Sequence, residues 1–123
     1  MLNELKQAKG PWYLCTPYSL YPQGHEAAWL EACRIAARLM RAGVNVFSPI
    51  AHSHPIAMHG NLDHLSHDLW LKQDLAHIEV APGCIVACMP SWGESKGVAW
   101  EMERFSALGK PVYLLEPVTL EIA

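Results

Sequence analysis

The sequence has few charged residues and no strong excess of either sign. Charged side chains make up 17% of the 123 residues, and the formal net charge is −3. Because a protein that binds nucleic-acid phosphates needs a basic surface, this balance argues against nucleic acid as a partner. No uninterrupted apolar run approaches the roughly 20 residues of a membrane span, and MLNELKQAKG at the start lacks the apolar segment of a secretory signal. We therefore expect a soluble, cytoplasmic protein that binds neither nucleic acid nor membrane.

Motifs for common cofactors and metals are also missing. The sequence contains no glycine-rich dinucleotide fingerprint and no Walker phosphate loop. None of its cysteines (Cys15, Cys33, Cys84 and Cys88) forms a C-x-x-C pair, and three of the four lie in apolar runs where a thiol usually serves as a small hydrophobe. We predict that all four cysteines are reduced and structural, and we expect no cofactor and no dedicated metal site.

About half of the residues are hydrophobic, which is enough for a single domain over residues 1–123 with its own core. Short apolar runs predict strands over 12–16, 44–48, 84–89 and 112–115. Amphipathic spacing predicts helices over 25–41, 62–78 and 95–108, with a polar, histidine-rich connection over 51–60. This alternation predicts an α/β fold: a doubly wound, flavodoxin-like, mostly parallel sheet of four or five strands with helices on both faces. Ligands of such folds bind beyond the carboxyl ends of the strands, here after Thr16, Ser48 and Met89.

The segment after the third predicted strand carries the strongest functional signal. Ser95 is a good helix N-cap, and Gly97 lies four residues before Glu101. A helical side chain leans toward the N-terminus of its helix, so Glu101 would lie over Gly97. Because glycine costs a helix about 1 kcal/mol relative to alanine, its presence here indicates that space is needed above the Glu101 carboxylate. The pattern favours a functional carboxylate over an exposed helical glutamate.

Other polar groups follow the first two predicted strands. Thr16-Pro17-Tyr18-Ser19 is rich in hydroxyl groups and suits a polar ligand, although it equally fits a turn before a helix. Asp74, Trp70 and His67 have a spacing that places them on one helix face, which an exposed helical charge would also satisfy. Five histidines follow the second strand: His52, His54, His59, His64 and His67. They can line a polar pocket or, with His64 and His67 three residues apart on the next helix, contribute to a metal site.

Three short motifs in this order resemble the nucleoside 2-deoxyribosyltransferase-like superfamily, and most closely a small bacterial branch of DUF1937 type. The motifs are Tyr13-Leu14-Cys15, Asp74, and Ser95-x-Gly97-x-x-x-Glu101, and the resemblance runs from Trp12 to about Leu115. It implies that Glu101 is a nucleophile, that Tyr13 hydrogen-bonds it and that Asp74 handles the leaving base. The substrate-binding residues expected with them are Thr16, Pro17, Tyr18, Trp70, Trp92, Ser95 and Gly97.

The resemblance leads us to expect an enzyme that cleaves or exchanges an N-glycosidic bond of a nucleoside or nucleotide. Ser95 stands where the transferases carry an acidic residue, and it resembles the nucleotide-hydrolysing branch, in which this serine contacts a 5′-phosphate. The Thr16–Ser19 loop, however, lacks the glycine and arginine of that branch. A binding module without turnover and a histidine-based metal-binding protein are the alternatives. Five tryptophans, with Trp29 and Trp100 on predicted helices, also favour a homodimer or higher homo-oligomer.

Overall fold

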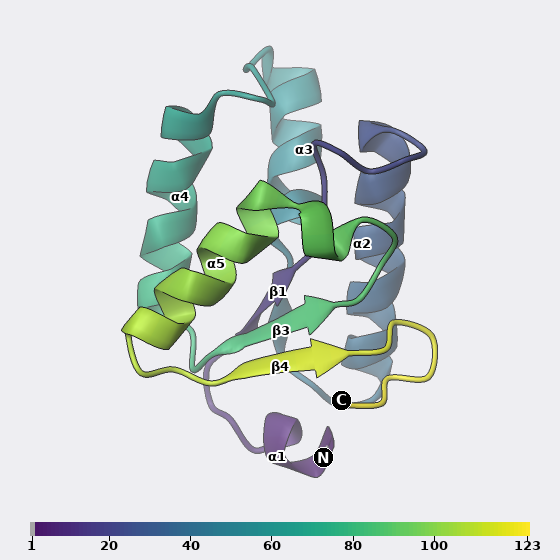
Figure 1. Cartoon of the computed structure of the whole chain (residues 1–123), viewed down its shortest axis with the longest axis vertical. Helices are drawn as coiled ribbons and strands as arrows, with labels where there is room; N and C mark the ends of the chain where they lie inside the picture. Colours follow the sequence, from purple (N-terminus) through teal and green to yellow (C-terminus); the bar gives the residue numbers. More distant parts are fainter. Residues whose placement is uncertain (1) are drawn as a thin grey trace.

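The protein forms a four-stranded parallel sheet, seen here in a computed structural model that describes residues 2–123. The strands are β1 (Trp12–Cys15), β2 (Val46–Phe47), β3 (Cys84–Ala87) and β4 (Val112–Leu115). Their order is β2-β1-β3-β4, with Tyr13 paired to Phe47 on one side and to Cys84 on the other. Figure 1 shows the sheet surrounded by the helices. The predicted doubly wound α/β fold is confirmed, with four strands.

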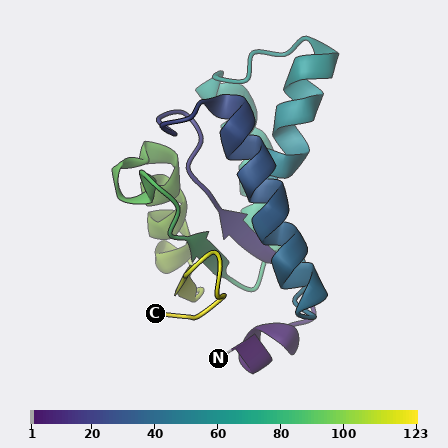
Figure 2. The same cartoon turned by 90° about the vertical axis from the view of Figure 1, so that its right-hand side faces the viewer.

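Helices cover both faces of the sheet. They are α1 (Leu2–Lys6), α2 (His25–Arg41), α3 (Pro49–Gly60), α4 (His67–Val80) and α5 (Lys96–Ala107), with a short 3₁₀ turn η1 (Trp92–Glu94). Figure 2 shows α2 and α5 on opposite sides of the sheet. No helix within residues 2–123 is long and apolar enough to span a membrane.

Strand β1 supplies the centre of both hydrophobic cores because its side chains alternate between the two faces. Trp12 and Leu14 pack on the α2 side with Ile35 and Leu39, and all four are buried. The Tyr13 and Cys15 side chains point to the other face, where the buried residues of α5 and α4 are Val98, Phe105 and Ile78. Tyr13 is therefore held between packed layers at the middle of the sheet.

A close backbone approach brings β1, β3 and β4 together at their N-terminal ends. A Cβ atom at Gly83 would lie 2.5 Å from the Pro111 carbonyl oxygen and 2.7 Å from the Trp12 ring. Only glycine fits this position, which sets the start of β3 against its two neighbours.

The sequence-based prediction of a polar connection over 51–60 is wrong, because these residues belong to helix α3. The Ser48 side chain caps this helix by accepting a hydrogen bond from the Ala51 amide at 3.1 Å, and Pro49 occupies the first turn, where its missing N–H costs nothing. Pro55 inside the helix and the surrounding histidines conceal the helical periodicity. Asn61, in the left-handed conformation with φ 59°, ends the helix.

Helix α4 and strand β2 also differ clearly from the prediction in their bounds, and one further helix was not predicted. Helix α4 begins at His67 rather than at Leu62, because Asp63 accepts from the Leu65 amide and stabilises a turn over these residues. Strand β2 is reduced to Val46–Phe47, at the edge of the sheet, and helix α1 was not predicted. Helix α2 has the predicted bounds, and Gly43 and Gly109 adopt the left-handed conformation expected after α2 and α5.

Candidate active site

A pocket of about 480 Å³ opens at the carboxyl ends of β1 and β3. Here the strand order changes direction, since β2 lies on one side of β1 and β3 on the other. The loop after β1, helices α3 and α4, their connection and the start of α5 all contribute to its walls. The residues that line it are Thr16, Tyr18, Ser19, Leu20, Pro49, Ile50, Ser53, His54, His64, Leu65, Ser66, His67, Trp70, Leu71, Asp74, Ser95, Lys96, Gly97, Trp100 and Glu101. The pocket thus lies where ligands of doubly wound sheets bind.

Glu101 lies in the second turn of α5 and lines the pocket, and a hydrogen bond from Tyr13 of β1 holds its side chain. Its side chain is only 8% exposed, and the Tyr13 hydroxyl donates a hydrogen bond of 2.5 Å to Oε2. Tyr13 itself is fully buried. Ser95 starts the helix by accepting from the Val98 amide at 3.2 Å, as its sequence position predicts. A Cβ at Gly97 would meet only Ser95 Oγ, at 3.9 Å, so an alanine has room here and the space expected above the Glu101 carboxylate does not depend on this glycine.

Burial changes the acid–base behaviour of both carboxyl groups in the pocket. Burial raises the pKa of Glu101 to about 8, and the charge of Asp74 acts in the same direction, against the hydrogen bond from Tyr13. Burial also raises the pKa of Asp74 to about 6, while His77 and the Tyr13 hydroxyl oppose that shift. The pKa of Tyr13 lies far above its usual range because of burial and both carboxylates, so its hydroxyl remains a donor.

Two interacting carboxyl groups with these values titrate as a pair rather than separately. Between about pH 6 and pH 8 the Glu101–Asp74 pair holds a single proton. At neutral pH one carboxyl group of the pair is therefore ionised and the other protonated, and the higher pKa of Glu101 gives it the larger share of the proton.

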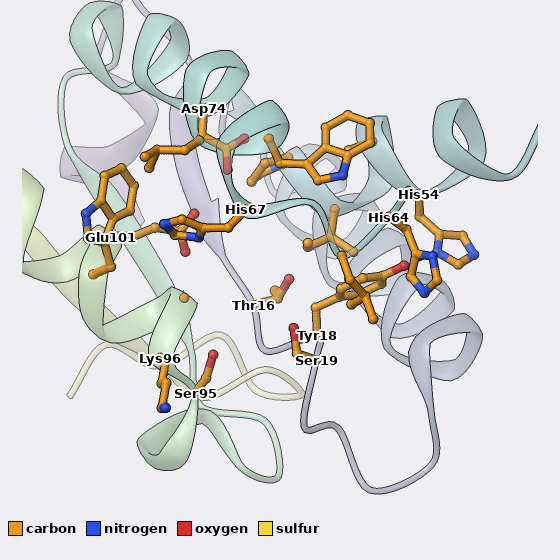
Figure 3. A pocket seen from close by; sticks show the side chains of 18 of the residues that line it. Thr16, Tyr18, Ser19, His54, His64, His67, Asp74, Ser95, Lys96 and Glu101 are labelled. Carbon is orange, nitrogen blue, oxygen red and sulfur yellow. The ribbon is translucent and has the colours of Figure 1, made fainter. Parts of the chain in front are cut away.

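A different wall of the pocket is suited to an anion. Figure 3 shows Thr16, Ser95 and Lys96 away from Asp74, and Lys96 is the first residue of α5. The N-terminus of a helix carries a partial positive charge. Thr16 Oγ1 is buried without a hydrogen-bond partner, although it belongs to the pocket lining. Because buried polar atoms are rarely left without a partner, this hydroxyl is a candidate contact for a ligand.

The third part of the lining consists of aromatic and imidazole rings. The Tyr18 hydroxyl lies 2.6 Å from His54 Nδ1, and His64 Nε2 lies 3.0 Å from His25 Nδ1. Within residues 2–123, no three histidine, cysteine or acidic side chains are placed to hold a metal ion together. His64 also precedes helix α4, so the expected His64–His67 pair on one helix face is not formed.

The structure brings most of the sequence-predicted site residues together. Thr16, Tyr18, Trp70, Asp74, Ser95, Gly97 and Glu101 line the pocket, and Tyr13 lies behind Glu101. Pro17 is buried and Trp92 packs against the α5-side core, and neither belongs to the lining. The sequence analysis missed Lys96, which its place directly after the Ser95 cap could have indicated. It also missed His25, whose partner is 39 residues away.

The raised pKa of Glu101 predicts how the free energy of unfolding depends on pH. A carboxyl group whose pKa rises from an ordinary 4.5 to about 8 on folding binds more protons in the folded state, so stability falls as pH rises across this interval. Glu101→Gln removes this loss and keeps an oxygen that accepts from Tyr13. We expect the variant to be more stable than the unaltered protein by about 2–4 kcal/mol at pH 8.5, measured by urea unfolding.

The same experiment at pH 5 and with Glu103→Gln supplies the controls. Glu103 is an exposed residue of the same helix, so its replacement should leave the pH dependence unchanged. Parallel stability curves for the unaltered protein and Glu101→Gln between pH 5 and pH 8.5 would contradict the burial of a proton-binding Glu101.

Comparison with known proteins identifies the family of the chain. Comparison with curated proteins gives no match. The family model described as "Domain of unknown function (DUF1937)" matches residues 10–117, which include every strand of the sheet and both carboxyl groups of the pocket. The chain belongs to the DUF1937 family.

Proposed function

We propose that this protein is an enzyme that breaks an N-glycosidic bond of a nucleoside or nucleotide and passes the sugar to water or to a second base. The observation that carries the proposal is the hydrogen bond from buried Tyr13 to Glu101, with Asp74 in the same pocket. Burying and orienting a carboxyl group beside a cavity does not help the fold, so this arrangement favours a functional role for Glu101. The order of these residues also supports membership in the nucleoside 2-deoxyribosyltransferase-like superfamily.

In the first step, ionised Glu101 attacks the anomeric carbon of the sugar. Since Tyr13 donates to Oε2, Oε1 is the oxygen left to form the new bond. The bond between the anomeric carbon and the base nitrogen breaks, and its electron pair stays with the base. Protonated Asp74 gives its proton to the departing base. The pKa values place the single proton of the pair mostly on Glu101, so the reactive form is the less populated arrangement, with the proton on Asp74 and the charge on Glu101.

In the second step, the sugar leaves Glu101. Asp74, now ionised, takes a proton from water or from the nitrogen of a second base, which attacks the anomeric carbon from the side the first base left. The bond to Glu101 Oε1 breaks, and its electron pair restores the carboxylate. Two displacements at one carbon retain its configuration, as in retaining glycosidases.

The pocket favours a nucleotide as substrate. Its volume accommodates a sugar with a base, and Lys96 at the start of α5 supplies a positive charge at a different wall from Asp74. We propose that a 5′-phosphate lies near Lys96, Ser95 and Thr16, while Glu101 reaches the anomeric carbon. Helix N-termini and lysine ammonium groups both stabilise phosphate.

The central prediction concerns release of free base from a panel of nucleosides and their 5′-monophosphates. The unaltered protein should release base from at least one member, with kcat/KM highest between about pH 6 and pH 8, because only there does the pair hold one proton. Glu101→Ala should lower turnover at least about 1,000-fold, because it removes the nucleophile. Chromatographic detection of free base measures both effects.

Glu103→Ala is the matched control, because Glu103 is exposed on the same helix and should leave turnover unchanged. Circular dichroism checks that Glu101→Ala is folded. Turnover of Glu101→Ala within a few-fold of the unaltered protein would refute the nucleophile. Tight binding of a nucleotide without turnover would instead support a binding module.

The role of Asp74 predicts a dependence on the leaving group. Asp74→Asn cannot donate a proton, and the loss is greatest where the departing base needs one most. We expect turnover to fall about 100-fold or more for poorly activated bases and less than about tenfold for activated ones. Steady-state kinetics over a series of substituted bases measures this difference. Equal losses across the series would make Asp74 a residue that only orients the substrate.

We also propose that the protein is a homodimer that acts in the cytoplasm, where its four free thiols stay reduced. Leu20 and Leu65 line the pocket yet are 60% and 52% exposed, so a second copy over the pocket mouth would cover them and exclude water from the sugar intermediate. Light scattering at micromolar concentration should give twice the mass of the chain. The mass of a single chain would contradict the dimer.

A further inference from the structure

Tyr18 forms a wall of the pocket that the chemistry above does not use. The residue follows β1 in the loop before α2, and its ring is surrounded by histidines. His25 stacks on the ring with centroids 4.7 Å apart and planes 24° apart, while His54 and His64 meet it edge-on at 5.7 and 6.1 Å. Because His25 stacks on one face of the ring and Tyr18 lines the pocket, its other face is the one available to a ligand.

The hydroxyl end of Tyr18 is fixed by His54. His54 belongs to α3 and is only 7% exposed, and its Nδ1 lies 2.6 Å from the Tyr18 oxygen. Trp29 of α2 stacks on the His54 ring, with the two ring centroids 4.9 Å apart and the planes 25° from parallel. The His54 ring therefore cannot turn without displacing Trp29, and Tyr18 is held at its ring and at its hydroxyl.

Burial and the neighbouring imidazole rings favour the neutral form of His54. Burial lowers the pKa of His54, the neighbouring His64 and His25 act in the same direction, and Glu26 opposes them. Burial also raises the pKa of Tyr18, so its hydroxyl keeps its proton. A neutral imidazole can accept that proton at Nδ1 in a hydrogen bond.

A second hydrogen bond supports this arrangement from behind. His25 opens helix α2 and His64 lies in the connection between α3 and α4, and their rings are joined Nδ1 to Nε2 at 3.0 Å. The Tyr18–His54 contact joins the loop after β1 to helix α3, and the His25–His64 contact joins helix α2 to the α3–α4 connection. No strand pairing links these four segments to one another.

We propose that His54 is a positioning residue that holds Tyr18 as a fixed stacking surface for a planar heteroaromatic leaving group. Figure 3 shows Tyr18, His54 and His64 on the side of the pocket opposite Glu101 and Asp74. A surface fixed in advance loses less freedom when a flat ring stacks on it, so the base binds more tightly. The inference rests on the proposed function for the identity of the ligand. It assigns to His54 a role in binding the base, with no part in bond breaking.

The experiment measures binding of adenine, cytosine and thymine to the protein by calorimetry at pH 7.5. For the best-bound base, Tyr18→Phe and His54→Leu should each weaken binding about tenfold. The double variant should be no weaker than either single variant, because both remove the same contact. His54→Asn should stay within about threefold, because an amide oxygen can accept near the position of Nδ1. His59→Leu, an exposed residue of the same helix, is the control and should bind like the unaltered protein.

Kinetics separate positioning from a purely structural role. His54→Leu should raise KM about tenfold and leave kcat within about twofold, since Tyr18 contacts the base in the ground state and the transition state alike. A structural role would lower the amount of folded enzyme, and hence apparent kcat, without changing KM. Tyr18→Phe keeps the test valid if His54→Leu does not fold.

The outcomes distinguish this inference from the proposed function. If bases bind with the expected pattern of variants but no substrate is turned over, the chemistry fails and the positioning by His54 stands. If turnover is found while Tyr18→Phe and His54→Leu bind bases like the unaltered protein, the positioning is refuted and the chemistry stands. If none of the three bases binds the unaltered protein at millimolar concentration, the inference is refuted.

Discussion

The hydrogen bond from Tyr13 to Glu101 is the interaction on which the rest of the site depends. It joins the central strand β1 to helix α5 inside the core, and both partners are buried. The strand is fixed by pairing on both sides, and the helix is fixed by Val98 and Phe105. Because both partners are held in this way, the Glu101 side chain has little freedom to turn at the wall of the pocket that it lines.

This arrangement lowers the stability of the fold in favour of the site. An ionisable group without a cationic partner in the core is unfavourable, and the raised pKa values of Glu101 and Asp74 express that cost. The deeper burial of Glu101 also separates its pKa from that of the half-buried Asp74. A glutamine at position 101 should make the protein more stable at high pH and would remove the proposed nucleophile. Such a conflict between stability and chemistry is typical of catalytic positions.

Local sequence patterns predicted the fold and several of the residues that line the pocket. Apolar runs of strand length and the Ser95 cap are short-range signals, and the structure confirms them. Helix α3 was missed because its prolines and histidines break the apolar periodicity. The Tyr18–His54 contact spans 36 residues and joins separate segments, so no local pattern indicates it. The sequence thus indicates the end of the pocket that holds the carboxyl groups more clearly than the wall formed by Tyr18 and His54.

The most direct test of the account is to trap the sugar on Glu101. A nucleoside substrate with fluorine at carbon 2 of the sugar slows the departure of the sugar from the enzyme more than its arrival, so the covalent intermediate accumulates. Mass spectrometry of the intact protein should then show the added mass of the fluorosugar without its base, and peptide mapping should place it on Glu101. Release of base from this substrate without an adduct, or an adduct on any other residue, would contradict the central claim.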